Sequence, residues 1–253
     1  MTLCIDIGNT RTTFALVHNG AVIAHAHESS RHSAFKKVQH VVHMLIAGAS
    51  PGAVSAAGIA SVFPYLTALV TNVVKEEMKR EPHIISAATA GMKTSYANPA
   101  AIGADRLCNA AAAFALAKGP AIVIDCGTAI TIDCVSASGE FIGGAILAGY
   151  RTAAHALAGN TAQLPDIPFE RPEKALGDST EHCLQSGVIL GTTFAIEGLV
   201  RKIVDEAYTI SSPALIVTGG HHDIFSATTS MEVQPIPDLV LMGIEILTAN
   251  AGR

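Results

Sequence analysis

A short polar turn, Asp125-Cys-Gly-Thr128, stands between two apolar stretches of the chain, 121–124 and 129–133. The pattern predicts a buried strand, a tight turn and a second strand whose residues begin to alternate. In such a turn, glycine lets the main chain approach a ligand, while backbone N–H groups and a threonine hydroxyl donate hydrogen bonds to it. The residue types at this spacing therefore indicate a phosphate-binding turn.

A second turn of the same kind lies in the stretch 3–12, near the start of the sequence. The aspartate, glycine and threonine of the two turns correspond in pairs: Asp6 with Asp125, Gly8 with Gly127, and Thr12 with Thr131. Alone, the early stretch fits a strand that ends in an ordinary Asx turn. Because the plan occurs twice, we interpret both as phosphate-binding hairpins of a duplicated fold that holds a nucleotide between its halves. Asp6 would then hold Mg²⁺, mainly through water, since Mg²⁺ keeps much of its hydration in proteins.

The stretch 96–106 contains a carboxylate, Asp105, and a guanidinium, Arg106, at the start of an apolar helix. Both follow directly after a proline-bearing loop and Gly103. An aspartate in that position accepts a hydroxyl proton, and an arginine binds an anion. The alternative is an acid that stabilises the helix N-terminus beside a solvated arginine. The apolar residues that follow favour the functional interpretation, because they indicate that the pair lies where the helix enters a core.

Three further features have weaker functional signals. Thr218-Gly-Gly220 fits an adenosine-site loop and equally a turn between a strand and a helix. His221 and His222 have no third ligand at metal spacing, and we interpret them as surface or helix-start residues. Cys126 lies inside a phosphate turn, but we assign it to packing, because phosphoryl transfer needs no thiolate there.

The elements that must position these residues follow from periodicity and from turn residues. In the first half, strands are expected at 3–7, 12–17, 21–26, 53–62, 83–86 and 92–95, and helices after 32 to about 49, from 64 into 75–81, and at 103–117. The dipeptide Asn19-Gly20 is a strong hairpin signal between the second and third strands. The first half therefore reads as three strands followed by alternating helices and strands.

The second half repeats this order, beginning with strands on both sides of the turn at Asp125 and a third strand at 141–147. A helix at 151–158, a proline-rich loop at 164–172 and a helix from the N-cap Ser179 to about 207 follow, with an interruption expected near Gly187 or Gly191. A strand at 215–220, an edge strand at 233–235 and a closing helix at 239–249 complete it. The sequence predicts an α/β protein of two tandem actin-like (ribonuclease-H-like) domains, 1–118 and 119–253, with mixed sheets flanked by helices.

Composition narrows the class of protein. The chain has 253 residues, 49% of them hydrophobic and 15% charged, with a net charge of −5 and a mean hydropathy of +0.40. No Lys/Arg cluster is present, so nucleic acid is not expected as a partner. The most apolar stretch, 110–124, is broken by Lys118-Gly-Pro120, and the N-terminus lacks a basic region, so neither a membrane span nor a signal peptide is predicted. Five scattered cysteines without a CxxC pair indicate a reduced, cytoplasmic protein.

Taken in order, the motifs resemble those of the type III pantothenate kinases, of the acetate and sugar kinase/Hsp70/actin superfamily. The matching stretches are Asp6-Ile-Gly-Asn-Thr10, Tyr96-x-x-Pro-x-x-x-Gly-Ala-Asp-Arg106, Asp125–Asp133, Gly143-Gly-Ala-Ile146, Thr161-Ala-Gln-Leu-Pro165, Ser179-Thr180 followed by Gln185-Ser-Gly187, and Thr218-Gly-Gly220. Each motif alone is weak, but the ordered set covers nearly the whole chain. The resemblance implies ATP-dependent phosphorylation of pantothenate to 4′-phosphopantothenate, the first step of coenzyme A synthesis.

The resemblance also implies roles for individual residues. Asp105 is the expected general base for the pantothenate hydroxyl. The expected pantothenate pocket consists of Tyr96, Gly103, Ala104, Asp105 and Arg106, joined by Thr180 of the partner subunit in a homodimer. The expected ATP contacts are Asp6, Ile7, Gly8, Asn9, Thr10, Arg11, Thr12, Thr13 and Thr128. Mg²⁺ accompanies ATP, and Asp125 is expected to help hold a monovalent cation, K⁺ or NH₄⁺.

The sequence departs from the family pattern at two positions. Thr13 stands where a lysine is common, which removes one expected cationic contact to ATP. Ala148 stands where a proline is usual before Gly149, which is expected to loosen that turn. Two other functions stay open: a regulatory or accessory nucleotide-binding protein without kinase activity, and another small-molecule kinase of the superfamily. The intact Asp6, Asp105, Arg106 and Asp125 favour the pantothenate kinase.

Overall fold

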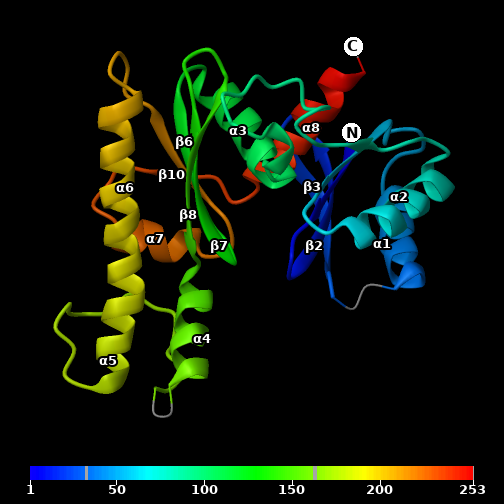
Figure 1. Ribbon diagram of the computed structural model, residues 1–253. Helices are drawn as coiled ribbons and strands as arrows, with labels where there is room; N and C mark the ends of the chain where they lie inside the picture. Colours follow the sequence, from blue (N-terminus) through cyan, green and yellow to red (C-terminus); the bar gives the residue numbers. More distant parts are fainter. Residues whose placement is uncertain (32–33, 162–163, 253) are drawn as a thin grey trace. The chain divides into compact units, whose positions relative to one another are not determined.

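The computed structural model describes residues 1–31, 34–161 and 164–252 (Figure 1). The chain forms two compact units. The first consists of residues 1–116, 139–141 and 238–253, and the second of residues 117–138 and 142–237. Each unit contains one five-stranded sheet.

The first sheet has the strand order β3-β2-β1-β4-β5. Its strands are β1 (Thr2–Ile7), β2 (Arg11–His18), β3 (Ala21–Ser29), β4 (Ala56–Ser61) and β5 (His83–Ile84). β1, β2 and β3 form an antiparallel meander, whereas β4 and β5 add in parallel. The predicted hairpin at Asn19-Gly20 is confirmed, with φ of 53° and 77°, because both turn residues need the left-handed region that Asn and Gly tolerate.

Helices cover the sheet of the first unit. They are α1 (Phe35–Ala47), α2 (Pro64–Met78), α3 (Ala104–Ala117), preceded by the 3₁₀ turn η1 (Pro99–Ala101), and α8 (Leu239–Ala251). α1 and α2 pack on the core that Phe14 and Leu16 of β2 share with Ile5 of β1. α8 lies close to β4 and α3, because Gly58 and Gly243 leave room there: a Cβ on Gly58 would collide with Thr248, and one on Gly243 with the main chain of Cys108.

The second sheet repeats the order of the first. Its strands are β6 (Ala121–Cys126), β7 (Ala129–Val135), β8 (Phe141–Ala148), β9 (Ala214–Thr218) and β10 (Gln234–Pro235), arranged as β10-β9-β6-β7-β8. β6 pairs antiparallel with β7 and parallel with β9, as β1 does with β2 and β4. The predicted duplication of a mixed sheet flanked by helices is confirmed.

The helices of the second unit are α4 (Tyr150–Asn160), α5 (Thr180–Gln185), the π-helical turn η2 (Ser186–Leu190), α6 (Gly191–Ala207) and α7 (His222–Thr228). Ser179 caps α5, since its hydroxyl accepts a hydrogen bond from the His182 N–H at 3.1 Å. The interruption expected near Gly187 or Gly191 is η2. This π-helical turn lies between α5 and α6, and the three segments follow one another without a break. Figure 1 shows α6 running along the second sheet.

Within the described part of the chain, one helix, Thr180–Ala207, is long and apolar enough to cross a membrane by length and composition alone. Its packing is that of a core helix: Ile196 and Val200 lie in the hydrophobic core of the second sheet. The helix also carries Glu197, which is 4% exposed and whose carboxylate accepts hydrogen bonds from Thr229 and Ser230, the two residues after α7. The apolar stretch 110–124 is divided between α3 and β6.

Three differences from the prediction bear on the organisation of the chain. Residues 92–95 form no strand; only Thr94 bridges to Phe141, because the segment meets the start of β8 at a single pair. α7 was not predicted, since its seven residues are too short to show a period. The two units also differ from the predicted domains 1–118 and 119–253, because α8 packs on β1 and β4 of the first unit.

Candidate functional site: two phosphate turns and an Asp-Arg helix start

The turn between β1 and β2 presents its residues to solvent. The Gly8 N–H donates to the Arg11 carbonyl at 3.1 Å, and Asn9, Thr10 and Arg11 are exposed. Beneath the turn, Ile7 is buried, and the buried Thr12 hydroxyl bonds to the Ser30 hydroxyl at 2.9 Å. Thr13, the last predicted ATP contact of this segment, is nearly buried and bonds to His27. The turn is thus held from below and leaves its outer face open for an anionic ligand.

Asp6 and Asp105 are placed near the same buried residue. Asp6 is the half-buried last polar residue of β1, and Asp105 lies in the first turn of α3. Burial first, and then the charges of Asp6 and Asp105, raise the pKa of the Cys108 thiol well above its ordinary value. Cys108 is therefore a packing residue, and two of the predicted functional carboxylates of the first unit lie around it.

The start of α3 holds Asp105 in a defined position. Its Oδ1 accepts a hydrogen bond from the Arg106 main-chain N–H at 2.9 Å, one of the N–H groups that a helix leaves without an internal partner. A Cβ on Gly103 would collide with Asp105 Oδ1. The glycine thus gives the carboxylate the room to lie over the helix start. Ala104, between them, is buried.

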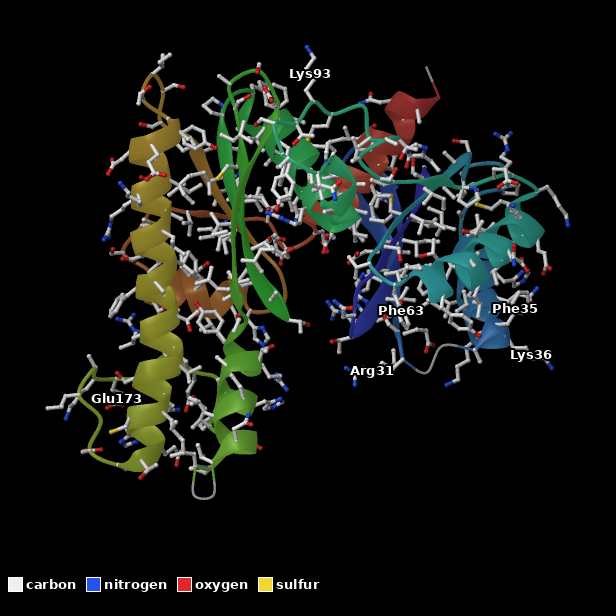
Figure 2. All side chains as sticks on the ribbon, viewed as in Figure 1. Arg31, Phe35, Lys36, Phe63, Lys93 and Glu173 are labelled. Atoms are coloured by element: carbon white, nitrogen blue, oxygen red, sulfur yellow. The ribbon has the colours of Figure 1, made fainter. Side chains whose placement is uncertain are left out.

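Arg106 is 7% exposed, and its guanidinium lies 5.2 Å from the centre of the Phe141 ring. Tyr96 meets the same ring edge-on at 6.0 Å. Main-chain bonds join Phe141 to this segment: its N–H donates to the Lys93 carbonyl at 2.9 Å, and its carbonyl accepts the Thr94 hydroxyl at 2.8 Å. The Lys93 side chain itself points outward (Figure 2). Tyr96 and Arg106 are therefore brought to the same aromatic ring.

The turn between β6 and β7 is bound by the start of α4. The Thr128 carbonyl accepts the Gly149 N–H at 3.1 Å and the Thr152 hydroxyl at 2.6 Å. A Cβ on Gly149 would collide with the main chain of Gly127 and Thr128. These contacts are present with alanine at position 148, and the looser turn expected there stays a prediction.

A third segment, Thr218–His221, lies against the same turn. Gly219 has φ of 88°, and a Cβ there would collide with Asp125 Oδ1 and with the Cys126 main chain. The His221 N–H donates to the Cys126 carbonyl at 3.0 Å. The segment is a turn between β9 and α7, as one interpretation held, and it also borders the carboxylate of Asp125.

Cys126 and the histidines take the roles predicted for them from their types. Cys126 is fully buried, and burial, followed by the charges of Asp125 and Asp223, raises the pKa of its thiol. His222 begins α7 and bonds through Nδ1 to the Gly219 carbonyl at 2.8 Å. A thiolate is thus disfavoured at the turn, and the histidines support the adjacent loop.

The donor set suits a magnesium–nucleotide complex better than a protein-held metal. Within the ranges that the structure describes, no group of three His, Cys, Asp or Glu side chains could hold a metal ion. Each phosphate turn instead offers one strand-end carboxylate, Asp6 or Asp125. Mg²⁺ is commonly bound by one or two carboxylates together with water and substrate phosphates, so the residues present fit it in that form.

Thr180 is the exposed first residue of α5, in the second unit. Of the predicted motif 161–165, Ala162 and Gln163 lie outside the described residues. Sequence reasoning missed three residues that contact predicted ones: Phe141 beside Arg106 and His27 beside Thr13 in the first unit, and Thr152 beside Thr128 in the second. Only tertiary contacts identify these residues, and a local sequence pattern does not predict such contacts.

Two sheets of the same strand order, each flanked by helices, define a protein of the actin-like fold. A solved structure, component A of (R)-2-hydroxyglutaryl-CoA dehydratase from Acidaminococcus fermentans, supports the fold alone, with a TM-score of 0.58, 10% identity, and coverage of 100% of this chain and 99% of that one.

The family model of type III pantothenate kinase matches residues 2–202. The type III pantothenate kinase of Roseiflexus sp. (strain RS-1) is 35% identical, over 98% of this chain and 98% of that one. That of Dehalococcoides mccartyi (strain ATCC BAA-2266 / KCTC 15142 / 195) is 34% identical, over 97% and 96%. The chain belongs to the type III pantothenate kinase family. The predicted resemblance and enzyme class are confirmed, and ATP and a divalent metal come with a kinase of this family.

Proposed function

We propose that this chain transfers the γ-phosphoryl group of ATP to the hydroxyl of pantothenate, giving 4′-phosphopantothenate and ADP in the first step of coenzyme A synthesis. The observation that carries the proposal is the start of α3, where Gly103 makes room for the Asp105 carboxylate beside a buried arginine. We place the reaction in the cytoplasm, in keeping with five free cysteines.

Asp105 acts as general base. A carboxylate held by the Arg106 N–H keeps its second oxygen for the substrate hydroxyl, which it orients and deprotonates as the phosphoryl group transfers. Arg106 supplies positive charge to the pantothenate carboxylate, and its position over the Phe141 ring keeps the guanidinium in one place. Tyr96, Gly103 and Ala104 complete the pocket on this side.

The two turns bind the triphosphate. Residues 6–13 offer N–H and hydroxyl donors at the first turn, and Thr128 does so at the second, where α4 holds its carbonyl. Mg²⁺, when bound, neutralises charge on the phosphate oxygens, with Asp6 as its protein partner through water. Phosphoryl transfer depends chiefly on such positioning and charge neutralisation, so the chain needs no covalent intermediate.

Asp125 holds a monovalent cation, K⁺ or NH₄⁺. A carboxylate in a turn that receives a triphosphate adds negative charge to negative charge, and a cation between them removes that cost. The approach of Gly219 to Asp125 Oδ1 encloses this carboxylate and supports the assignment.

The active unit is a homodimer in which Thr180 of one subunit reaches the pantothenate held by Asp105 of the other. An exposed Thr180 after a long proline loop supports this arrangement. So do large apolar side chains that the second unit leaves exposed, among them Ile146 at 62% and Phe194 at 55%. Burial of such side chains favours subunit association.

Purified protein is expected to consume ATP with pantothenate and not with a panel of sugars or acetate, because the Asp-Arg pair suits a substrate that carries both a hydroxyl and a carboxylate. Mass spectrometry of the product identifies 4′-phosphopantothenate. Turnover of a sugar or acetate in its place would point to another kinase of the superfamily, and ATP binding with no turnover to a regulatory protein.

The same assay is expected to depend strongly on the monovalent cation, with high activity in K⁺ or NH₄⁺ and low activity in Na⁺ or Tris at equal ionic strength. The reason is the charge balance at Asp125. Equal rates in all four cations would argue against a cation role for this residue.

A further inference from the structure

Three polar side chains stand in a row across the first sheet. Asp6 of β1 lies directly opposite Thr13 of β2, and Thr13 lies directly opposite His27 of β3. Residues that are opposite each other in antiparallel strands project from the same face, with Cβ atoms about 5 Å apart. The row lies one residue pair away from the first phosphate turn, with Ile7 and Thr12 as the pair between them. The turn is also joined to the residue after β3, because the Ser30 N–H donates to the Thr10 carbonyl.

One hydrogen bond of this row is defined by its atoms: His27 Nδ1 lies 3.1 Å from Thr13 Oγ1. Thr13 is 9% exposed, whereas His27 is exposed. The His25 ring lies beside it, tilted by 44° with ring centres 5.0 Å apart, but His25 stands opposite Ala15, which has no side-chain polar atom. The two histidines therefore share a strand face and differ in having a polar partner across the sheet.

The surroundings of His27 favour a neutral ring, mainly through burial. Burial, followed by Arg11 and His25, lowers the pKa of His27, while Asp238 at the start of α8 acts in the opposite direction. A neutral imidazole has one N–H, either at Nδ1 or at Nε2.

The partners of Thr13 decide where that N–H belongs. A threonine hydroxyl has a single hydrogen, while an ionised Asp6 and a bound triphosphate only accept hydrogen bonds. If Nδ1 donates to Thr13, the Thr13 hydrogen is left for these acceptors. If Nδ1 accepts instead, the Thr13 lone pairs face other acceptors, which is unfavourable.

We propose that His27 is a positioning residue for ATP: its Nδ1–H donates to Thr13 Oγ1 and turns the Thr13 hydroxyl hydrogen toward the phosphates at the Gly8–Arg11 turn. The inference rests on the proposed function in that it takes this turn as part of the ATP site. The inference adds His27 of β3 to the site. His27 acts on the nucleotide indirectly, by orienting the Thr13 hydroxyl.

The test is calorimetric binding of the Mg²⁺ complex of a non-hydrolysable ATP analogue, without pantothenate, to the full chain. His27→Phe keeps a ring and removes the donor, so the affinity is expected to fall about threefold to tenfold, the effect of one hydrogen bond. His27→Asn places an amide N–H at the Nδ1 position and is expected to restore affinity to within about twofold. In steady-state kinetics the loss should appear in KM for ATP, with kcat and KM for pantothenate little changed.

His25→Phe is the matched control, because His25 lies on the same strand face and stands opposite Ala15 in place of a polar residue. This variant is expected to bind the analogue like the wild type. In a Thr13→Val background, His27→Phe should have no further effect on analogue affinity. This expectation is the same even if His27→Phe alone lowers the melting temperature. Unchanged affinity in His27→Phe, an equal loss in His25→Phe, or an undiminished effect in the Thr13→Val background would overturn the inference.

This experiment separates the inference from the function on which it rests. A protein that binds the analogue with this dependence on His27 but does not phosphorylate pantothenate would refute the proposed reaction and keep the role of His27. If the protein phosphorylates pantothenate and its analogue affinity does not depend on His27, the proposed reaction is kept and the role of His27 is refuted.

Discussion

Asp105→Asn is expected to lower kcat for pantothenate phosphorylation by at least about 10²-fold, because general-base help of this kind contributes about 10² to 10⁴-fold. The amide keeps an oxygen that accepts the Arg106 N–H, so the start of α3 and the pocket shape are retained. Pantothenate should therefore still bind in calorimetry. The measurement is steady-state turnover beside the binding titration.

The control for lost charge is Asp205→Asn, which removes an exposed carboxylate of α6 and is expected to leave turnover unchanged. Gly103→Ala gives an independent check, because its Cβ would displace the Asp105 carboxylate while keeping its charge. Turnover like that of the wild type in Asp105→Asn would remove this residue from the role of base.

Two inactive variants are expected to restore activity to each other if the site is shared between subunits. Asp105→Asn removes the base, and Thr180→Arg, at an exposed position, blocks the pocket of the other chain. In a mixed dimer, one site has both changes and the other has neither. Random reassortment makes about half the dimers mixed, each with one intact site of two, so about a quarter of wild-type activity should return. The two variants are co-expressed or co-refolded, and the mixture is assayed.

The complementation can be interpreted only if mixed dimers are present in the mixture. Mass measurement of the mixed dimer confirms that it formed. If mixed dimers are present and activity does not exceed that of either parent, the site lies within one chain and the role of Thr180 is lost.

Local sequence signals predicted the parts of the site that one segment builds by itself. The turns at Gly8 and Gly127 follow from a strand, a glycine and a hydroxyl in succession, and the start of α3 follows from Gly103 and the acid after it. Such features depend on neighbours a few residues away, whose preferences the sequence states directly. The family resemblance added the substrate, which no residue pattern specified.

Contacts between distant segments could not be predicted in this way. Phe141 lies under Arg106 because residues 93–95 bond to its main chain, and Gly219 borders Asp125 because β9 pairs with β6. Hydrophobic periodicity shows that α8 has an apolar face, but not which sheet receives it. The small residues Gly58 and Gly243 decide that, through a fit visible only in three dimensions.

The packing of α8 on β1 and β4 has a consequence for the order in which the chain can fold during synthesis. The last helix, Leu239–Ala251, packs on β1 and β4, the strands that leave the ribosome first and fourth. The first unit therefore cannot complete its core until the whole second unit has been translated, although N-terminal domains often fold first. If translation terminates before residue 239, β1 and β4 lack the helix that packs on them. Even a truncation near the C-terminus is therefore expected to destabilise the first strands of the chain.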